Sequence, residues 1–178
     1  MQLGRAGTQR GESKSLALLG DQSVRERYIL GVDPGKQHTA QVFLSEGRPA
    51  WAQQFKGTDD AAVVATIRVL PVGTVVVVEL QFFKDNAQSL IHLVEARCAW
   101  EVRARDRGLA VVRRHVSTWQ HKMLNKYDGG PRGNRKLQSI AHAQEHAPGL
   151  VFYRGALSEH KADAFAIARH HYLYGEDK

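Results

Sequence analysis

The chain has 178 residues, of which 43% are hydrophobic and 24% are charged, values that are typical of one soluble globular domain. It has no apolar run long enough for a membrane helix and no signal-peptide pattern, and its single cysteine, Cys98, excludes an intrachain disulfide and a cysteine-based zinc site. We therefore expect a cytoplasmic protein without a membrane partner, and the formal net charge of +7 favours a polyanionic partner.

The first 27 residues differ from the rest of the chain. They mix glycine, serine, glutamine and charged residues without a clear period. We interpret residues 1–27 as a flexible basic N-terminal extension and residues 28–178 as the folded domain. That domain opens with "YILGVD", a short apolar run that ends on Asp33.

Runs rich in β-branched and apolar residues predict the strands. The five predicted strands are 28–33, 39–45, 50–56, 74–80 and 109–115. The fourth, "TVVVVEL", is apolar on both faces, as in a strand buried within a sheet. We expect a hairpin turn at Gly47, Arg48 and Pro49, between the second and third strands.

Helical periodicity and capping residues predict the helices. The five predicted helices are 61–70, 86–107, 117–124, 136–147 and 159–173. Asp59 and Asp60 suit the start of the first, and Ser117 suits the start of the third. The order of elements predicts an α/β domain, with a mixed five-stranded sheet and helices on both faces.

The long second helix has an apolar stripe of its own. Leu90, Val94, Cys98 and Val102 fall at spacing four and predict its buried face. Trp100 lies off that stripe, so the apolar positions of this helix exceed one face.

Acidic residues end two of the predicted strands. Asp33 ends the first and Glu79 the fourth, and these strands can lie side by side and parallel. His160 and Asp163 share one face of the last helix, whose "ADAFAIA" stretch allows close packing on the sheet. Alone, each has an ordinary explanation as a turn residue or a solvated side chain. Together they predict a carboxylate cluster suited to Mg²⁺ or Mn²⁺, with two such ions for phosphodiester chemistry.

Three segments carry a resemblance to a known family. "ILGVDPG", "VVVVELQFFKDNAQSLIHLVEARC" and "HKADAFAIA" resemble the motifs of RuvC-type Holliday junction resolvases, which have the RNase H-like fold of the retroviral integrase superfamily. The resemblance implies a metal-dependent endonuclease that acts as a homodimer and nicks four-way DNA junctions symmetrically. It covers most of residues 28–173, and residues 1–27 have no counterpart in it.

Site residues follow from the resemblance by position. It implies that Asp33, Glu79 and Asp163 are metal ligands. The position three before the last acid is acidic in many members and histidine in some, and here it is His160, either a ligand or a proton shuttle. Glu159 is the alternative fourth ligand. Phe82 matches an aromatic wedge that enters the junction centre, and Phe83 is the alternative wedge.

A basic segment independently favours a nucleic-acid substrate. Residues 97–136 contain eleven Lys and Arg against three acids, a larger excess than that of the whole chain. A glycine-rich loop within this segment can follow a phosphate backbone. The predicted DNA-contacting bases are Lys126, Arg132, Arg135 and Lys136 of this loop, and the resemblance implies that Lys122 and Lys136 lie near phosphate-contacting lysines. Trp119, nearby, is expected to lie in the core.

Three functions compete at this point. The first is a Mg²⁺-dependent junction endonuclease, whose symmetric nicking requires a dimer. We expect helix 86–107, Trp100 included, to form the interface. The second is the RuvC-like nuclease domain of a transposase, and the third is a non-catalytic protein that binds branched DNA.

Overall fold

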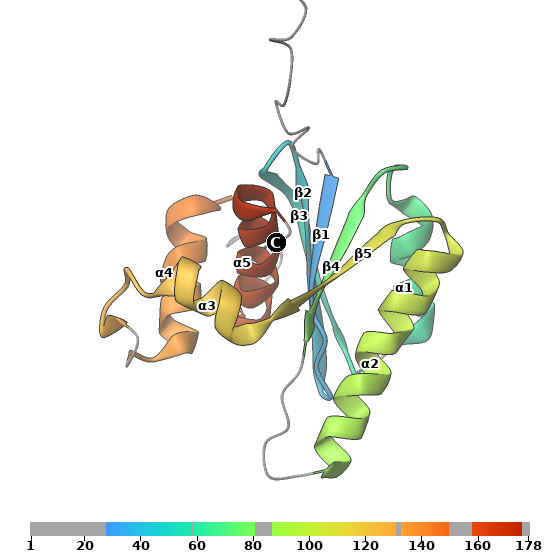
Figure 1. Cartoon of the computed structure of the whole chain (residues 1–178), viewed down its shortest axis with the longest axis horizontal. Coiled ribbons are helices and arrows are strands. Elements are labelled where there is room, and N and C mark those ends of the chain that lie inside the picture. The colour runs from blue at the N-terminus through green and yellow to red at the C-terminus, as the bar shows by residue number, and fades with distance from the viewer. Residues whose placement is uncertain (1–27, 58, 81–86, 131–132, 150–157, 176–178) are drawn as a thin grey trace, which may run out of the picture.

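A five-stranded mixed sheet with helices on both faces forms the frame of the protein (Figure 1). The computed structural model describes residues 28–57, 59–80, 87–130, 133–149 and 158–175. The order of strands across the sheet is β3-β2-β1-β4-β5. The predicted extension at 1–27 lies outside the described residues.

All five predicted strands are confirmed. They are β1 (Tyr28–Asp33), β2 (His38–Ser45), β3 (Arg48–Lys56), β4 (Val75–Leu80) and β5 (Ala110–His115). The first three form an antiparallel meander, whereas β1 pairs with β4 and β4 with β5 in parallel. The predicted parallel pairing of the first and fourth strands is therefore confirmed.

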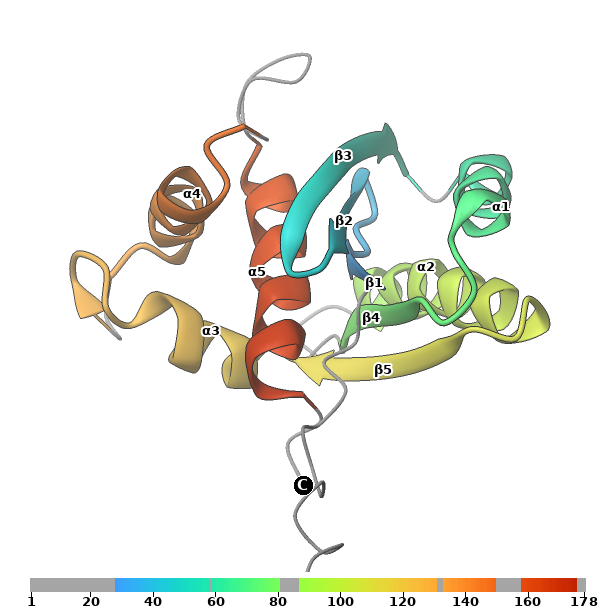
Figure 2. The same ribbon diagram turned by 90° about the horizontal axis from the view of Figure 1, so that it is seen from above.

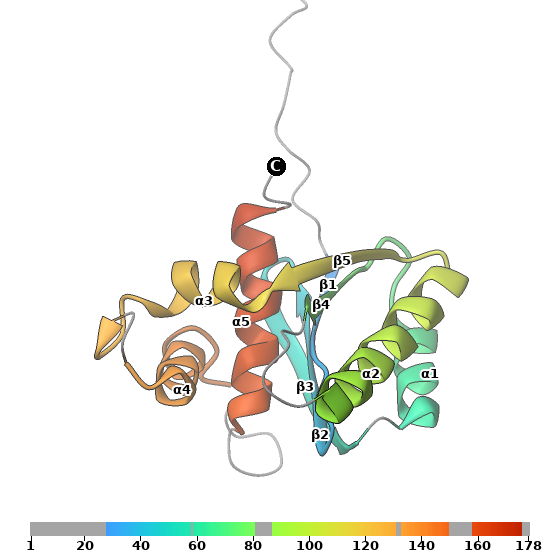
Figure 3. The ribbon, with the colours of Figure 1, turned by 60° about the horizontal axis from the view of Figure 1, so that its bottom comes forward.

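The helices also match the prediction within a few residues. They are α1 (Asp60–Val69), α2 (Ala87–Asp106), α3 (Val116–Leu124), α4 (Arg135–His146) and α5 (Glu159–Tyr174). Helices α1 and α2 cover one face of the sheet, and α3, α4 and α5 lie on the other (Figure 3). Helix α4 packs on α5 rather than on the sheet (Figure 2). None of the described helices combines the length and apolar character that a membrane crossing requires.

Side-chain alternation along the strands divides the core into two layers. Residues Val75 and Val77 of β4 face α5, whereas Val76 and Val78 face α1 and α2. Every residue from Val75 to Glu79 is buried, because β4 lies inside the sheet with both faces covered. Because side chains alternate along a strand, Asp33 points to the same face as Ile29 of β1, and Glu79 points to the same face as Val75 of β4. That face is covered by α5.

Two predicted boundaries are wrong. The hairpin turn is at Glu46 and Gly47, both with positive φ (52° and 72°), the backbone that a tight two-residue hairpin requires. Pro49 instead belongs to β3, an edge strand, where proline is tolerated. Helix α3 begins one residue before Ser117, with His115 at its N-cap position, so Ser117 is not its cap.

The predicted buried stripe of α2 is also wrong. The buried residues are Ala96, Trp100, Glu101 and Ala104, whereas Val102 is 50% exposed. Trp100 is fully buried and stacks on Phe55 of β3, with ring centroids 6.2 Å apart. The large indole sets the rotation of the helix, and alanines one turn on either side allow it to approach the sheet. Trp100 therefore cannot serve the predicted dimer interface.

Candidate active site

Two acidic residues meet at the carboxyl edge of the sheet. The register of β1 and β4 pairs Val32 with Val78, which puts Asp33 and Glu79 at the next position. Asp33 is 7% exposed and Glu79 is 8% exposed. Carboxylates at adjacent ends of parallel strands lie where open α/β sheets form their ligand sites.

Helix α5 supplies the remaining groups. Ser158 caps its N-terminus and accepts a hydrogen bond from the backbone N–H of Lys161, 3.2 Å away. Gly31 of β1 lies so close to this helix that an added Cβ would be 2.2 Å from the carbonyl oxygen of Ala164. Glycine and alanines at this crossing therefore bring the first turns of α5 over the ends of β1 and β4. The predicted close packing of "ADAFAIA" on the sheet is confirmed.

His160 and Asp33 form a direct pair. His160 Nδ1 lies 2.8 Å from Asp33 Oδ2, and its Nε2 lies 3.9 Å from Glu159 Oε1. The hydrogen bond to Asp33 raises the pKa of His160 above its usual value, and the negative charges of Asp33, Glu159 and Asp163 act in the same direction. This imidazole is consequently protonated more readily than a free one.

Asp163 lies between polar and acidic neighbours. Its Oδ1 accepts a hydrogen bond from the Ser139 hydroxyl of α4. Burial raises the pKa of Asp163 to about 7, and the nearby charge of Asp33 contributes in the same direction. The carboxylate form of Asp163 is therefore incompletely compensated by the protein itself.

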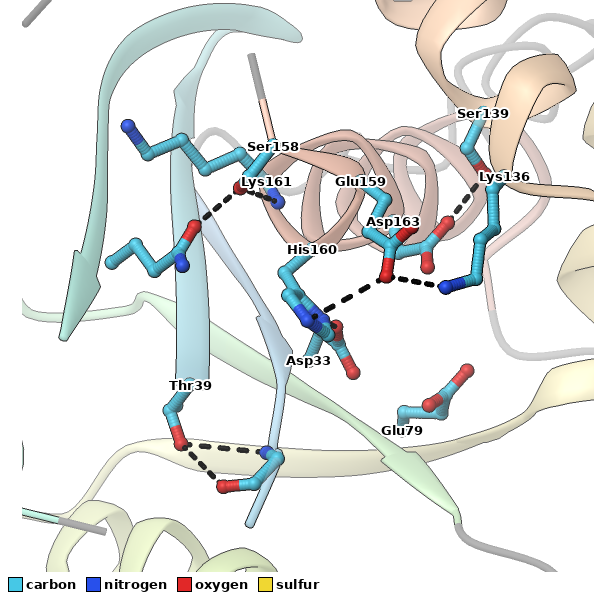
Figure 4. Close-up of polar contacts among 12 residues, drawn as sticks. Asp33, Thr39, Glu79, Lys136, Ser139, Ser158, Glu159, His160, Lys161 and Asp163 are labelled. Carbon is cyan, nitrogen blue, oxygen red and sulfur yellow. Dashed lines mark hydrogen bonds and ion pairs between the residues drawn. The ribbon is translucent and has the colours of Figure 1, made fainter. Parts of the chain in front are cut away.

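Glu79 and Glu159 each have a partner from another element. The indole N–H of Trp119 donates to Glu79 Oε1 at 3.0 Å, and Lys136 Nζ lies 2.7 Å from Glu159 Oε1. Figure 4 shows Glu79, Glu159 and Lys136 at the end of the sheet, around the first turns of α5. Glu159, the alternative fourth ligand, is thus paired with a lysine.

An open pocket of about 410 Å³ gives access to part of this cluster. Asp33, His160, Asp163, Glu159 and Lys136 line it. The turn after β1, from Pro34 to His38, forms another wall. Glu79 is not among the residues that line the pocket, and its Oε1 accepts a hydrogen bond from the indole N–H of Trp119.

The donor set suits a hard divalent cation in its chemistry but not in its geometry. In the described part of the chain, no three acidic, histidine or cysteine side chains stand in an arrangement that would hold a metal ion. However, three carboxyl groups converge on one edge, and one of them has its pKa raised through burial and a neighbouring acid. Oxygen-rich, negatively charged sites of this composition suit Mg²⁺ or Mn²⁺.

The predicted DNA-contacting bases are dispersed. Lys136 alone among those described lines the pocket. Arg135 Nη1 instead binds Asn125 and Gln138, each at 3.0 Å, and Lys126 Nζ binds Glu145 at 3.1 Å. Lys122 lies over the Tyr174 ring, 4.8 Å from its centroid. Phe82, Phe83 and Arg132 lie outside the described residues.

Two residues of the site escaped the sequence prediction. Trp119 was expected in the core and is fully buried there, but nothing in the sequence linked its N–H to Glu79. Ser139 is also fully buried. Its signal in the sequence is slight: a hydroxyl on a face that the helix otherwise buries with His142 and Ala143.

The chain resembles solved structures of one bacterial protein, RuvC. The T. thermophilus RuvC in complex with a Holliday junction substrate matches it with a TM-score of 0.63 and 22% identity, over 83% of this chain and 94% of that chain. A second Thermus thermophilus RuvC structure matches with a TM-score of 0.60 and 23% identity, over the same shares. The chain has the RuvC-like fold. The predicted RNase H-like architecture is thereby confirmed. No protein-family model and no curated protein sequence matches the chain.

Proposed function

We propose that the protein is a metal-dependent, structure-selective DNA endonuclease that resolves four-way junctions by paired nicks. The observation that supports the proposal is the proximity of Asp33, His160 and Asp163 in a RuvC-like fold, at the sheet edge where β4 also ends with Glu79 and Leu80. The excess of basic residues in 97–136 supports a polyanionic substrate. Such an enzyme would serve DNA recombination or repair in the cytoplasm.

Each group at the site has a role in this proposal. Asp33, Glu79 and Asp163 would hold the divalent cations, with His160 as a further ligand or as a proton shuttle. Bound Mg²⁺ would act as a Lewis acid on the scissile phosphate and lower the pKa of the attacking water. Lys136 stands at the rim of the pocket, where it can exchange its pairing with Glu159 for a DNA phosphate.

His160 can hold protons at two distinct atoms. Its Nδ1 faces Asp33, which orients the ring, and its Nε2 faces the less enclosed side near Glu159. A shuttle would give up the Nε2 proton to the leaving oxygen. His160→Ala should then lower the cleavage rate, and His160→Asp should retain part of it if the role is ligation. Full activity of the alanine variant would remove His160 from the mechanism.

The central experiment is cleavage of a labelled four-way junction. Mg²⁺ or Mn²⁺ should produce symmetric nicks, EDTA should stop them, and duplex, flap and single-stranded substrates of equal length should be cut far more slowly. Junction binding without cleavage under every metal condition would favour the non-catalytic alternative. Strand transfer into a target duplex would favour the transposase alternative.

The proposal also includes a homodimer and an aromatic wedge. Symmetric nicking is most simply achieved by two sites related by a two-fold axis. Half-exposed Ile91 and Val102 on α2 remain candidates for the interface, now without Trp100. Sedimentation that gives a monomer both free and on DNA would contradict the dimer. For the wedge, Phe82→Ala should reduce junction cleavage more than junction affinity, with Phe83→Ala as its matched comparison.

A further inference from the structure

Two fully buried polar side chains reach the acidic cluster from the helices outside the sheet. Trp119 of α3 donates its indole N–H to Glu79 Oε1 at 3.0 Å. Ser139 of α4 donates its hydroxyl to Asp163 Oδ1. The partners are 40 and 24 residues apart in sequence, so packing of α3 and α4 beside α5 brings them together.

These contacts do more than satisfy buried donors. A buried tryptophan N–H or serine hydroxyl commonly finds a backbone carbonyl or water. Here both donors end on carboxylates at the same edge, and hydrogen bonds to ionised groups are roughly twice as strong as neutral ones. Each contact engages one named oxygen, Oε1 of Glu79 and Oδ1 of Asp163.

The surrounding core restrains both donors. Trp119 packs in the same apolar layer as Val75 and Val77 of β4 and Phe165 of α5. Ser139 lies on the buried face of α4, one turn before Ala143. Because neither side chain can move without disturbing this layer, the two carboxyl groups are oriented by the packing of α3 and α4.

We propose that Trp119 and Ser139 are positioning residues that fix the orientation of Glu79 and Asp163 toward a divalent cation. This inference rests on the proposed function. Residues that orient the ligands of a metal typically change its affinity when mutated, even though they do not touch the ion.

The test uses Trp119→Phe and Ser139→Ala. The first keeps an aromatic ring and removes the N–H, and the second removes only the hydroxyl. Trp100→Phe is the matched control for the first, since Trp100 is equally buried but lies in the opposite core layer. Thr66→Val is the control for the second. Thr66 lies on the buried face of α1, and its hydroxyl accepts a hydrogen bond from the Gln41 side chain of β2.

Affinity for Mn²⁺, measured by calorimetry without DNA, is the first readout. We expect Trp119→Phe and Ser139→Ala to weaken binding by about 10- to 100-fold, and the two controls to stay within about threefold of the parent chain. If Trp119→Phe and Ser139→Ala bind Mn²⁺ with the same affinity as their controls, the positioning role is overturned. The proposed function would survive that result, since the parent chain still binds the metal.

The indole N–H of Trp119 provides a second readout, which is taken on the parent chain itself. The chain has three tryptophans, so three indole resonances can be assigned by the one that each Trp→Phe variant lacks. Mg²⁺ should shift the Trp119 resonance and leave those of Trp51 and Trp100 in place, and Glu79→Gln should abolish the shift. A Trp119 resonance that ignores bound Mg²⁺ overturns the inference.

The two failures are distinguishable. If the parent chain binds neither Mn²⁺ nor Mg²⁺ and none of the three resonances responds, both the positioning role and the metal-dependent function are overturned. If the metal binds and cleavage occurs but the Trp119 signal and variant affinities are unchanged, only the positioning role is overturned.

Discussion

Two carboxylates on opposite faces of the sheet have opposite surroundings. Glu101 of α2 is 2% exposed and is contacted by Arg113 (2.6 and 2.8 Å), Arg97 (3.1 Å) and Arg105 (3.4 Å). The hydrogen bond from Arg113 lowers its pKa, helped by the charges of all three guanidinium groups. Asp163 of α5 faces Asp33 instead, and its pKa is raised to about 7.

The difference separates a charge that the protein neutralises from one that suits the proposed metal site. Glu101 is neutralised by the protein and joins α2 to β5 through Arg113. Asp163 has Asp33 and Glu159 as acidic neighbours, which the Ser139 hydroxyl and His160 offset only in part, so an external cation would stabilise its carboxylate form. A group whose pKa is perturbed by burial and by a like charge, beside an open pocket, is characteristic of a functional site.

The largest expected effect is on cleavage. Asp163→Asn should lower the rate of junction cleavage by at least about 10³-fold, because a bound cation contributes several kcal/mol to phosphodiester chemistry. Asp33→Asn and Glu79→Gln should act alike, while junction affinity stays close to that of the parent chain. Gel-based cleavage and binding assays measure both quantities. Asp106→Asn is the control, because Asp106 is an exposed acid at the end of α2. Near-normal cleavage by any site variant would remove its residue from the proposed site.

The next effect concerns how α5 is held on the sheet. Gly31→Ala puts a Cβ 2.2 Å from the Ala164 carbonyl and 2.8 Å from the Ala168 nitrogen, so helix and strand must separate. We expect a loss of about 3 kcal/mol in the free energy of unfolding, at the upper end for overpacking, and loss of cleavage as Asp163 moves away from Asp33.

Urea unfolding and the junction assay test this prediction together. Gly149→Ala is a matched control, since an added Cβ there meets no atom of the described residues within 4 Å. If Gly31→Ala is as stable and active as Gly149→Ala, the close approach of α5 does not determine the site.

Exchanging a carboxylate for an amide should have opposite effects on stability on the two faces. Glu101→Gln should cost about 2 kcal/mol, less than for a fully buried pair because Arg105 and Arg113 are about half exposed. Asp163→Asn should leave stability unchanged or raise it in metal-free buffer, because it removes an incompletely compensated charge. Glu95→Gln, at an exposed position on α2, is the control for urea unfolding. Equal losses in the free energy of unfolding for Glu101→Gln and Asp163→Asn would contradict the contrast between the two faces.

The smallest effect is a pH dependence on the α5 side. Burial lowers the pKa of His142 from 6.5 to about 3, with the charges of His146, Arg169 and Lys126 acting in the same direction and Glu145 opposing. Below pH 6.5 the unfolded chain therefore takes up a proton that the folded chain refuses. The free energy of unfolding should therefore decrease as the pH is lowered from 6.5 toward 3, by up to about 1.4 kcal/mol per pH unit.

Urea unfolding at pH 7, 6 and 5 measures this slope. His142→Gln should flatten it, because glutamine does not titrate and its amide can still donate to the Tyr127 hydroxyl oxygen, which lies 3.1 Å from His142 Nδ1 and donates its own proton to Glu145. His121→Gln, an exposed histidine of α3, should leave the slope unchanged. An identical slope in parent and His142→Gln would exclude His142 as its source.

The sequence by itself determined the order of elements and the meeting of the principal acids. Period-two and helical patterns located the strands and helices, and a strand-helix-strand order makes β1 and β4 parallel neighbours. Because parallel strands end at the same edge, Asp33 and Glu79 had to meet there. The glycine and alanines that bring α5 onto β1 are also local features of the chain.

Only the tertiary structure decided which side chains surround those acids. The link from Trp119 to Glu79, the rotation of α2 around Trp100 and the pairing of Lys126 with Glu145 join segments far apart in sequence. A periodic pattern records which face of an element is apolar, but it does not record which neighbour that face will meet. Long basic side chains reach several partners, so their role depends on packing that the local sequence does not encode.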